Sequence, residues 1–420
     1  MNSISKKELT IHIKYNNQDI WMPLDNPTHL TNKEITVPVK IDQVVYEDKN
    51  LEFDGYTIYM TKKCNFNCSY CFVNRENLDS IVAFTDIVQF IEKRGKKEIQ
   101  IRFFGGEPLI KIDEVRKWVI GFEKMREKGY SFSYGIVTNG SLLSPEIIDF
   151  LYEFKFIVII SHELNDELQQ KNRAASLELQ ETILKNIQYL SKTKLANRTT
   201  VRCMLDPNSP SSLLKQYQYA VELGIRGVQF DIPHVKDDSD HIYSQDSINR
   251  LKKQIEELTI FYWEKIEERD YRYLGLFNLD NLLKIWILRK QYIDFDTCGF
   301  GINHFAIDVD GTIYPCQNFA GVNEFSIGNV MTGINEKQYA TDIERHKECC
   351  SCELKELCTK RCYYSNYIGT GDIYKPNNMQ CEMKKEFVMA AIYLLYKLKE
   401  HPDIFEDYTT MLKVKERFLR

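Results

Sequence analysis

Six short apolar segments alternate with helical stretches between residues 56 and 231, and this alternation constrains the fold more than any other feature. Apolar segments that are each followed by a helical stretch are typical of strand–helix units with a parallel sheet. The predicted strands are Tyr56–Met60, Ile99–Phe104, Phe132–Thr138, Phe156–Ser161, Thr199–Leu205 and Gly227–Asp231. The predicted helices between them are Ile81–Lys96, Asp113–Lys128, Pro145–Phe154, Leu177–Lys192 and Ser211–Leu223. Right-handed crossovers between such units predict an α/β fold, a partial (β/α)6 barrel of the TIM type.

Unusual residues follow the carboxyl ends of the predicted strands. The first strand is followed by Cys64-Asn65-Phe66-Asn67-Cys68-Ser69-Tyr70-Cys71, the second by Gly105-Gly106-Glu107-Pro108 and the third by Thr138-Asn139-Gly140. Ser161 ends the fourth strand. Asp231 ends the sixth, where its carboxylate could act as a catalytic base, anchor a substrate or cap a loop. Because parallel α/β barrels build active sites at this face, the sequence predicts one site there.

The three cysteines of the first loop have the spacing C-x3-C-x2-C. Three thiolates from one loop can bind three irons of a four-iron cluster and leave the fourth iron open to a substrate. A structural zinc site needs four thiolate or imidazole ligands, and neither a His nor a fourth Cys lies nearby in the sequence. An iron–sulfur cluster on Cys64, Cys68 and Cys71 is therefore the favoured interpretation.

With the aromatic Tyr70 before its third Cys, this loop resembles the cluster-binding motif of the radical S-adenosylmethionine (radical SAM) family. The resemblance implies that the cluster binds S-adenosylmethionine (SAM) and that Gly105–Pro108 binds its amino group. It also implies contacts to SAM from Thr138, Asn139, Ser161, Glu163 and Arg173. The family's usual Ser-x-Asp-Gly is replaced by Ser161-His162-Glu163-Leu164-Asn165, so the ribose contact falls to Glu163 or elsewhere. Arg173 either contacts the carboxylate or is a surface helix residue.

A second cysteine array begins before a predicted hairpin around Asp310-Gly311 and continues after it. It comprises Cys298, Cys316, then Cys349-x2-Cys352-x5-Cys358-x3-Cys362, and Cys381, an order that resembles the SPASM extension of radical SAM peptide-modifying enzymes. The resemblance implies two auxiliary [4Fe–4S] clusters, one on Cys349, Cys352, Cys358 and Cys381 and one on Cys298, Cys316 and Cys362. Either Cys350 completes the second set, or its open iron takes a substrate thiolate. Cys203 lies inside a predicted strand and is expected to be a buried thiol.

Composition excludes several classes of protein. The chain has 420 residues, of which 43% are hydrophobic, so it can bury a sizeable core. Its formal net charge of -5 gives no basic footprint for nucleic acid. No apolar run is long enough to span a membrane, and residues 1–7 lack the apolar stretch of a signal peptide. We therefore expect a cytoplasmic protein, in which metal ligation accounts for the twelve cysteines better than a disulfide framework does.

The expected organisation has five parts: residues 1–55 as an N-terminal cap or peptide-binding segment, 56–235 as the barrel, 236–297 as a helical connector, 298–385 as the SPASM domain and 386–420 as a C-terminal helix. Within the first part, Ile35–Ile41 alternates as an edge strand should. Such a strand could pair with an extended peptide or belong to a small cap.

The two resemblances together imply an enzyme that cleaves SAM and uses a 5′-deoxyadenosyl radical on a ribosomally made precursor peptide, forming a thioether or carbon–carbon crosslink. They also imply an electron donor such as flavodoxin or ferredoxin. One alternative is an anaerobic sulfatase-maturating enzyme, in which a catalytic Asp follows the Cys of the Tyr-Pro-Cys segment. Here Gln317 follows Cys316, and a neutral amide cannot take up a proton as a carboxylate does. A non-enzymatic iron–sulfur redox sensor is the other alternative, and it would not need the Gly105–Pro108 segment.

Overall fold

The computed structural model describes residues 2–7, 10–24, 28–33, 53–74, 80–206, 209, 211–234, 243–289, 298–335, 346–355, 357–358 and 362–419. The predicted edge strand Ile35–Ile41 lies outside these residues. None of the described helices combines the length and the apolarity needed to cross a membrane.

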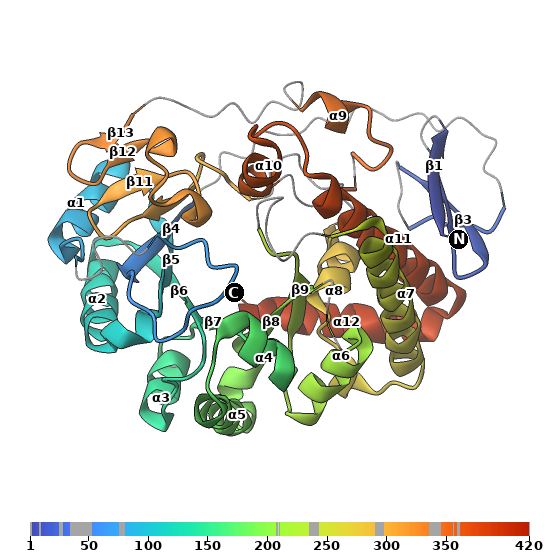
Figure 1. The fold of residues 1–420 in the computed structure, drawn as a ribbon, viewed down its shortest axis with the longest axis horizontal. Helices are drawn as coiled ribbons and strands as arrows, with labels where there is room; N and C mark the ends of the chain where they lie inside the picture. The colour runs from blue at the N-terminus through green and yellow to red at the C-terminus, as the bar shows by residue number, and fades with distance from the viewer. Residues whose placement is uncertain are drawn as a thin grey trace.

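A ten-stranded sheet forms the centre of the molecule (Figure 1), in the order β13-β12-β11-β10-β4-β5-β6-β7-β8-β9. The barrel part of this sheet comprises the parallel strands β4 (Phe53–Thr61), β5 (Glu98–Gly105), β6 (Ser131–Thr138), β7 (Ile157–Ser161), β8 (Thr199–Met204) and β9 (Val228–Asp231). Each coincides with a predicted strand to within a few residues. Residues alternate along them, so that in β5 Ile99, Ile101 and Phe103 are buried in the core while Arg102 and Phe104 are only half-buried. The predicted partial barrel is confirmed.

Helices follow the strands of the barrel in the predicted order. They are α1 (Phe84–Arg94), α2 (Ile112–Met125), α3 (Pro145–Glu153), α5 (Leu177–Ser191) and α6 (Leu213–Glu222), with short 3-10 turns at Pro108–Lys111, Arg126–Lys128 and Lys194–Arg198. An additional helix, α4 (Asp166–Arg173), has a polar sequence and was not predicted. Asn165 caps it by accepting a hydrogen bond from the backbone of Leu168, and its buried face carries Asn172 and Arg173.

The predicted hairpin around Asp310-Gly311 is present as β10 (His304–Ile307) and β11 (Thr312–Tyr314). It extends the barrel sheet, because β10 pairs with β4 in parallel. Gly55 permits this pairing, since a Cβ there would lie 2.5 Å from the ring of His304. The short strands β12 (Gly328–Asn329) and β13 (Gly333–Ile334) complete this edge. The second cysteine array is thereby joined to the first strand of the barrel.

Most of the remaining elements lie beyond β9, on the right of Figure 1, whereas helix α10 (Tyr363–Thr370) lies above the sheet near the centre of the view. The remaining elements are the N-terminal antiparallel sheet β1 (Ser3–Lys7), β2 (Thr10–Tyr15) and β3 (Gln18–Pro23), and the helices α7 (Gln245–Glu267), α8 (Phe277–Lys284), α9 (Lys347–Cys350), α10, α11 (Asn378–Glu400) and α12 (Pro402–Leu419). Helix α11 begins earlier than the predicted start at residue 386, because Asn377 caps its first turn. Pro402 then begins a second helix, α12, where one C-terminal helix was expected.

Candidate active site

The first cysteine loop and the carboxyl ends of the strands line one cavity of about 150 Å³. The loop begins where β4 ends and carries all three of its thiols to this cavity. The predicted cofactor residues that line it are Tyr70, Gly105, Gly106, Thr138, Asn139, Ser161 and Arg173. Glu107, Pro108, Glu163 and Asp231 do not line it.

Asparagine side chains hold the cysteine loop against the end of β6. The amide of Asn139 donates to Asn65 Oδ1 at 2.8 Å and lies 3.9 Å from the sulfur of Cys64. Asn65 in turn donates to the hydroxyl of Ser141 at 2.8 Å. Burial raises the pKa of the Cys64 thiol to about 11, and the charges of Glu107 and the other two cysteines of the loop add to this. The raised pKa keeps this thiol protonated on its own, and a bound metal cluster, whose ligands are thiolates, would displace the proton.

Glu107 supports the site without facing it. Its carboxylate is fully buried and accepts hydrogen bonds from Leu109 N at 3.0 Å, Thr138 Oγ1 at 2.8 Å and Asn139 N at 2.7 Å. Burial raises its pKa to about 7, although these three hydrogen bonds oppose the shift. The sequence suggested Glu107 as an acceptor for a ligand, but the structure uses its oxygens to join the Gly105–Pro108 turn to the end of β6.

Glu163 has a similar role on the opposite side of the cavity. One carboxylate oxygen contacts both the hydroxyl of Tyr70 and, at 2.8 Å, Nε of Arg173, and the other accepts from Met204 N at 3.0 Å. The side chain is fully buried, so it is not placed to contact a ribose, and Ser161 lines the cavity in its stead. Arg173 is 4% exposed and is no surface residue; its Nη2 has no hydrogen-bond partner among the described residues. That nitrogen could hold an anionic group.

Two histidines and the predicted catalytic Asp occupy different places. His162 is fully buried and accepts a hydrogen bond from Leu164 N, and burial lowers its pKa to about 3. His234 lines the cavity. Asp231 pairs with Arg202 and lines a neighbouring cavity between β9, α8 and α11. Arg202 itself lines the cysteine cavity, so the ion pair stands between the two.

The hairpin of the second array also reaches the cavity. Gln317 and Asn318, directly after Cys316, line it, and the hydroxyl of Tyr59 donates to the carbonyl oxygen of Gln317 at 2.7 Å. Sequence reasoning singled out Gln317 for its identity but not for this location. It missed Arg202, whose position inside a strand gave no signal beyond the alternation of its neighbours.

The second cysteine array separates into two neighbourhoods. A cavity of about 460 Å³ is lined by Cys349, Cys352, Cys358, Cys362 and Cys381. Burial raises the pKa of Cys381 to about 11, and Cys358 and Cys349 add to the shift. Burial and Cys362 likewise raise the pKa of Cys316 to about 12. Phe300 stacks on Tyr363 with centroids 4.1 Å apart, which brings the segment after Cys298 beside Cys362. Cys350 does not line the cavity.

The spread of these thiols fits clusters better than single ions. Within the described ranges, no three Cys, His, Asp or Glu side chains converge as the ligands of one metal ion do. The thiolates of a four-iron cluster each bind a different iron and stand farther apart than the ligands of one zinc ion. Cysteine side chains around a shared cavity are therefore compatible with the predicted clusters.

Comparison with known protein families identifies the domain that the barrel forms. Residues 58–220 match the family model of the radical SAM superfamily. The chain contains a radical SAM domain. The matched residues run from β4 into α6 and include the three cysteines of the first loop and most of the barrel.

Relatives and solved structures extend the likeness beyond this domain. The chain is 26% identical over 362 residues to a cysteine-type anaerobic sulfatase-maturating enzyme of Clostridium novyi (strain NT), covering 78% of this chain and 92% of that one. It is 23% identical over 374 residues to the radical SAM cyclopropyl synthase TigE of Paramaledivibacter caminithermalis, covering 80% and 73%. The structure titled native anSMEcpe with bound AdoMet and Kp18Cys peptide matches with a TM-score of 0.67 at 20% identity, covering 82% of this chain and 99% of that one. The shared fold therefore includes elements outside the barrel.

Proposed function

We propose that this radical SAM enzyme is a maturase that acts on a ribosomally made precursor peptide and forms a thioether or carbon–carbon crosslink in it. One observation carries the proposal: Gln317 and Asn318 of the second cysteine array line the same cavity as Cys64, Cys68 and Cys71. A substrate in this cavity lies within reach of both arrays. The relatives, whose names include sulfatase-maturating enzymes and a cyclopropyl synthase, agree with such chemistry.

The residues of the cavity have separate roles in this proposal. Cys64, Cys68 and Cys71 hold the first [4Fe–4S] cluster and leave one iron for SAM. Gly105 and Gly106 let the backbone approach its amino group. The buried guanidinium of Arg173, which is fixed by Glu163 through its Nε, offers its remaining nitrogens to the carboxylate.

When bound, the first cluster and SAM supply a low-potential electron and, from it, a 5′-deoxyadenosyl radical that removes one hydrogen atom from the peptide. In a thioether product, the sulfur of a peptide Cys bonds to the carbon that lost this hydrogen. The thiol proton would pass to a base, and an auxiliary iron–sulfur cluster, which cysteines of the second array would hold, would supply the acceptor for the remaining electron. The peptide thus loses two hydrogen atoms, and SAM is converted to methionine and 5′-deoxyadenosine.

Sulfatase maturation is the second candidate, and the likeness to enzymes of that name favours it. Gln317 argues against it. It stands at the position that carries a catalytic Asp in those enzymes, and it lines the cavity where such a base would act. An amide cannot accept the proton.

The test begins with the cofactors. Protein reconstituted anaerobically with iron and sulfide should hold about twelve irons if three four-iron clusters are present. With SAM and dithionite it should form 5′-deoxyadenosine, and the Cys64→Ala variant should not. If wild type and the Cys64→Ala variant form equal amounts of 5′-deoxyadenosine, the enzyme proposal fails and the redox-sensor hypothesis remains.

Mass spectrometry then identifies the reaction. The probe is a Cys-containing peptide encoded by a small reading frame beside the gene, with a scrambled peptide as control. A crosslinked product lacks two hydrogen atoms, and a thioether also resists alkylation of its thiol after reduction. Conversion of Cys to formylglycine would instead replace sulfur by oxygen, and that product would reject the crosslinking proposal.

A further inference from the structure

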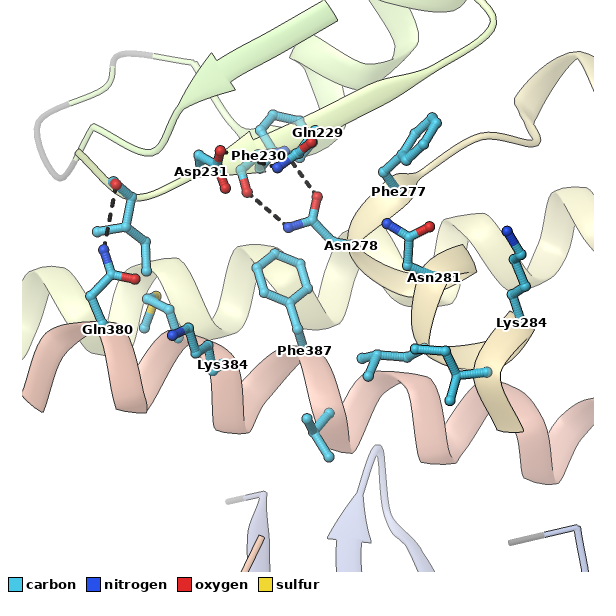
Figure 2. Close-up of a pocket in the computed structure, with 15 residues that line it drawn as sticks. Gln229, Phe230, Asp231, Phe277, Asn278, Asn281, Lys284, Gln380, Lys384 and Phe387 are labelled. Carbon is cyan, nitrogen blue, oxygen red and sulfur yellow. Dashed lines mark hydrogen bonds between the residues drawn. The ribbon is translucent and has the colours of Figure 1, made fainter. Parts of the chain in front are cut away.

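A second cavity, of about 340 Å³, lies at the open edge of the barrel between β9, α8 and α11 (Figure 2). Gln229, Phe230 and Asp231 come from β9, Asn278, Asn281 and Lys284 from α8, and Gln380, Lys384 and Phe387 from α11. We call this cavity the β9 groove. The radical chemistry described above leaves it without a role.

Side-chain amides, in place of a neighbouring strand, cover the edge of β9. Asn278 Oδ1 accepts from Phe230 N at 2.9 Å, and Asn278 Nδ2 donates to Phe230 O at 2.8 Å. These are the two hydrogen bonds that a residue on an adjacent strand would make. Two residues along, Gln380 donates to Ile232 O at 3.4 Å. The backbone of β9 at this edge is therefore hydrogen-bonded by side-chain amides, which have the same donor and acceptor groups as a peptide backbone.

These amides retain hydrogen-bonding capacity on the side of the groove. A primary amide has two N–H donors and two acceptor lone pairs. Among the described residues, the side chain of Asn278 makes only its two bonds with Phe230, and that of Gln380 makes only its bond with Ile232. Asn281, one turn after Asn278, is exposed and makes no side-chain hydrogen bond to the described residues. The groove therefore has unused amide donors and acceptors on both α8 and α11.

Apolar side chains make up much of the remaining lining, and the groove shares lining residues with both cysteine cavities. Phe277, Leu282, Ile285, Met383, Phe387 and Val388 supply the apolar surface. At one end, Ile232 also lines the cavity of the first cysteine loop. Gln380, Lys384 and Val388 also line the cavity of the second array. A linear ligand suits three adjoining cavities better than a compact one does.

We propose that the β9 groove binds an extended segment of the substrate peptide, whose backbone hydrogen-bonds to Asn278, Asn281 and Gln380 and whose apolar side chains pack on Phe387 and its neighbours. The inference rests on the proposed peptide maturase activity and adds the route by which the chain reaches the radical. Neutral amides pair with a peptide backbone in the manner of strand addition. Lys284 and Lys384, at opposite ends of the groove in Figure 2, favour a neutral or acidic peptide over a basic one.

Photocrosslinking tests the site without requiring turnover. Asn281 is replaced by p-benzoylphenylalanine, and the full-length reconstituted protein is irradiated with the biotin-labelled peptide of the previous section. The control carries the same residue at Ile120, which is 50% exposed on α2. We expect crosslinking at position 281 that unlabelled peptide competes away, and none above background at position 120. Equal labelling at both positions, or equal labelling by the scrambled peptide, would overturn the inference.

Steady-state kinetics separates this inference from the proposed function. Asn281→Trp fills the groove and should raise the KM for the peptide at least about tenfold while changing kcat by less than about twofold. Ile120→Trp should change neither. If the peptide is modified with an unaltered KM in Asn281→Trp, the groove is not the binding site although the maturase activity stands. If the protein with p-benzoylphenylalanine at position 281 crosslinks the peptide but wild-type protein never modifies it, the groove stands and the proposed reaction does not.

Discussion

We expect Glu386→Gln to stabilise the protein at pH 8 and to have little effect near pH 5. Glu386 lies on α11, is 1% exposed, and accepts a hydrogen bond from the side chain of Asn2 at 3.2 Å. Burial raises the pKa of its carboxyl from 4.5 to about 7, and the hydrogen bond from Asn2 only partly offsets the shift. The folded protein therefore resists ionisation of this group.

The sign of the effect follows from proton binding. Between about pH 4.5 and pH 7, Glu386 is protonated in the folded protein and ionised in the unfolded chain, so stability falls as the pH rises through this range. A pKa difference of this size corresponds to roughly 3 kcal/mol above pH 7 and to about 1 kcal/mol or less at pH 5. Gln keeps the acceptor for Asn2 but carries no charge, and so it removes the penalty.

Thermal unfolding measures this difference. For 420 residues the entropy of unfolding is about 0.9 kcal/mol/K, so the melting temperature of Glu386→Gln should exceed that of wild type by about 3–4 °C at pH 8. The difference should shrink to about 1 °C at pH 5. Glu257→Gln, an exposed site on α7, is the matched control and should follow wild type throughout. A Glu386→Gln protein that melts with wild type at both pH values would refute the assignment of a buried, neutral carboxyl.

Three further substitutions test the framework of the site. Lys62→Met breaks the buried ion pair of Lys62 with Asp308 (2.8 Å) and should lower the free energy of unfolding by about 3–5 kcal/mol, most of which the double variant with Asp308→Leu should restore. Asp54→Asn removes the charge that Arg94 contacts at 2.9 Å; we expect chemical denaturation to show a loss of about 1–3 kcal/mol. Cys203→Ala should lower the free energy of unfolding by about 1–2 kcal/mol, because it leaves a small cavity in β8. The iron content of the reconstituted protein should not change. A lower iron content would show that this thiol is a ligand.

The barrel could be predicted because its signals are local. Each parallel strand is an apolar run, and each functional motif begins where such a run ends. The direct pairing of β10 with β4 joins residues about 250 positions apart, as in the register His304 with Gly55, and no local pattern encodes it. Helix α4 was missed for a related reason, since the features that fix it, such as the buried Arg173, become visible only in three dimensions.

The sequence predicted which residues belong to the candidate site better than it predicted what each of them does. Glu107 and Glu163 were singled out as contacts for a ligand, yet both are fully buried and use their oxygens within the protein. A buried carboxylate must have its acceptors satisfied, and the nearest donors belong to neighbouring loops and strands. The sequence shows that a carboxylate is present but not which donors surround it. Asp231 is a similar case, because its carboxylate pairs with Arg202, which the sequence pattern did not indicate.

The two edges of the barrel sheet are completed by different means, and this difference locates the proposed route of the peptide. A sheet of six parallel strands does not close, so both β4 and β9 present unpaired backbone groups. The edge of β4 is paired over residues 55–58 with the strand β10, which carries the hairpin of the second cysteine array. The edge of β9 has one short backbone contact, Val228 N to Gly275 O at 2.9 Å, and is otherwise covered by amide side chains. Side chains can turn aside or share their hydrogen bonds where a paired strand cannot, so the proposed peptide site should lie at β9 and not at β4.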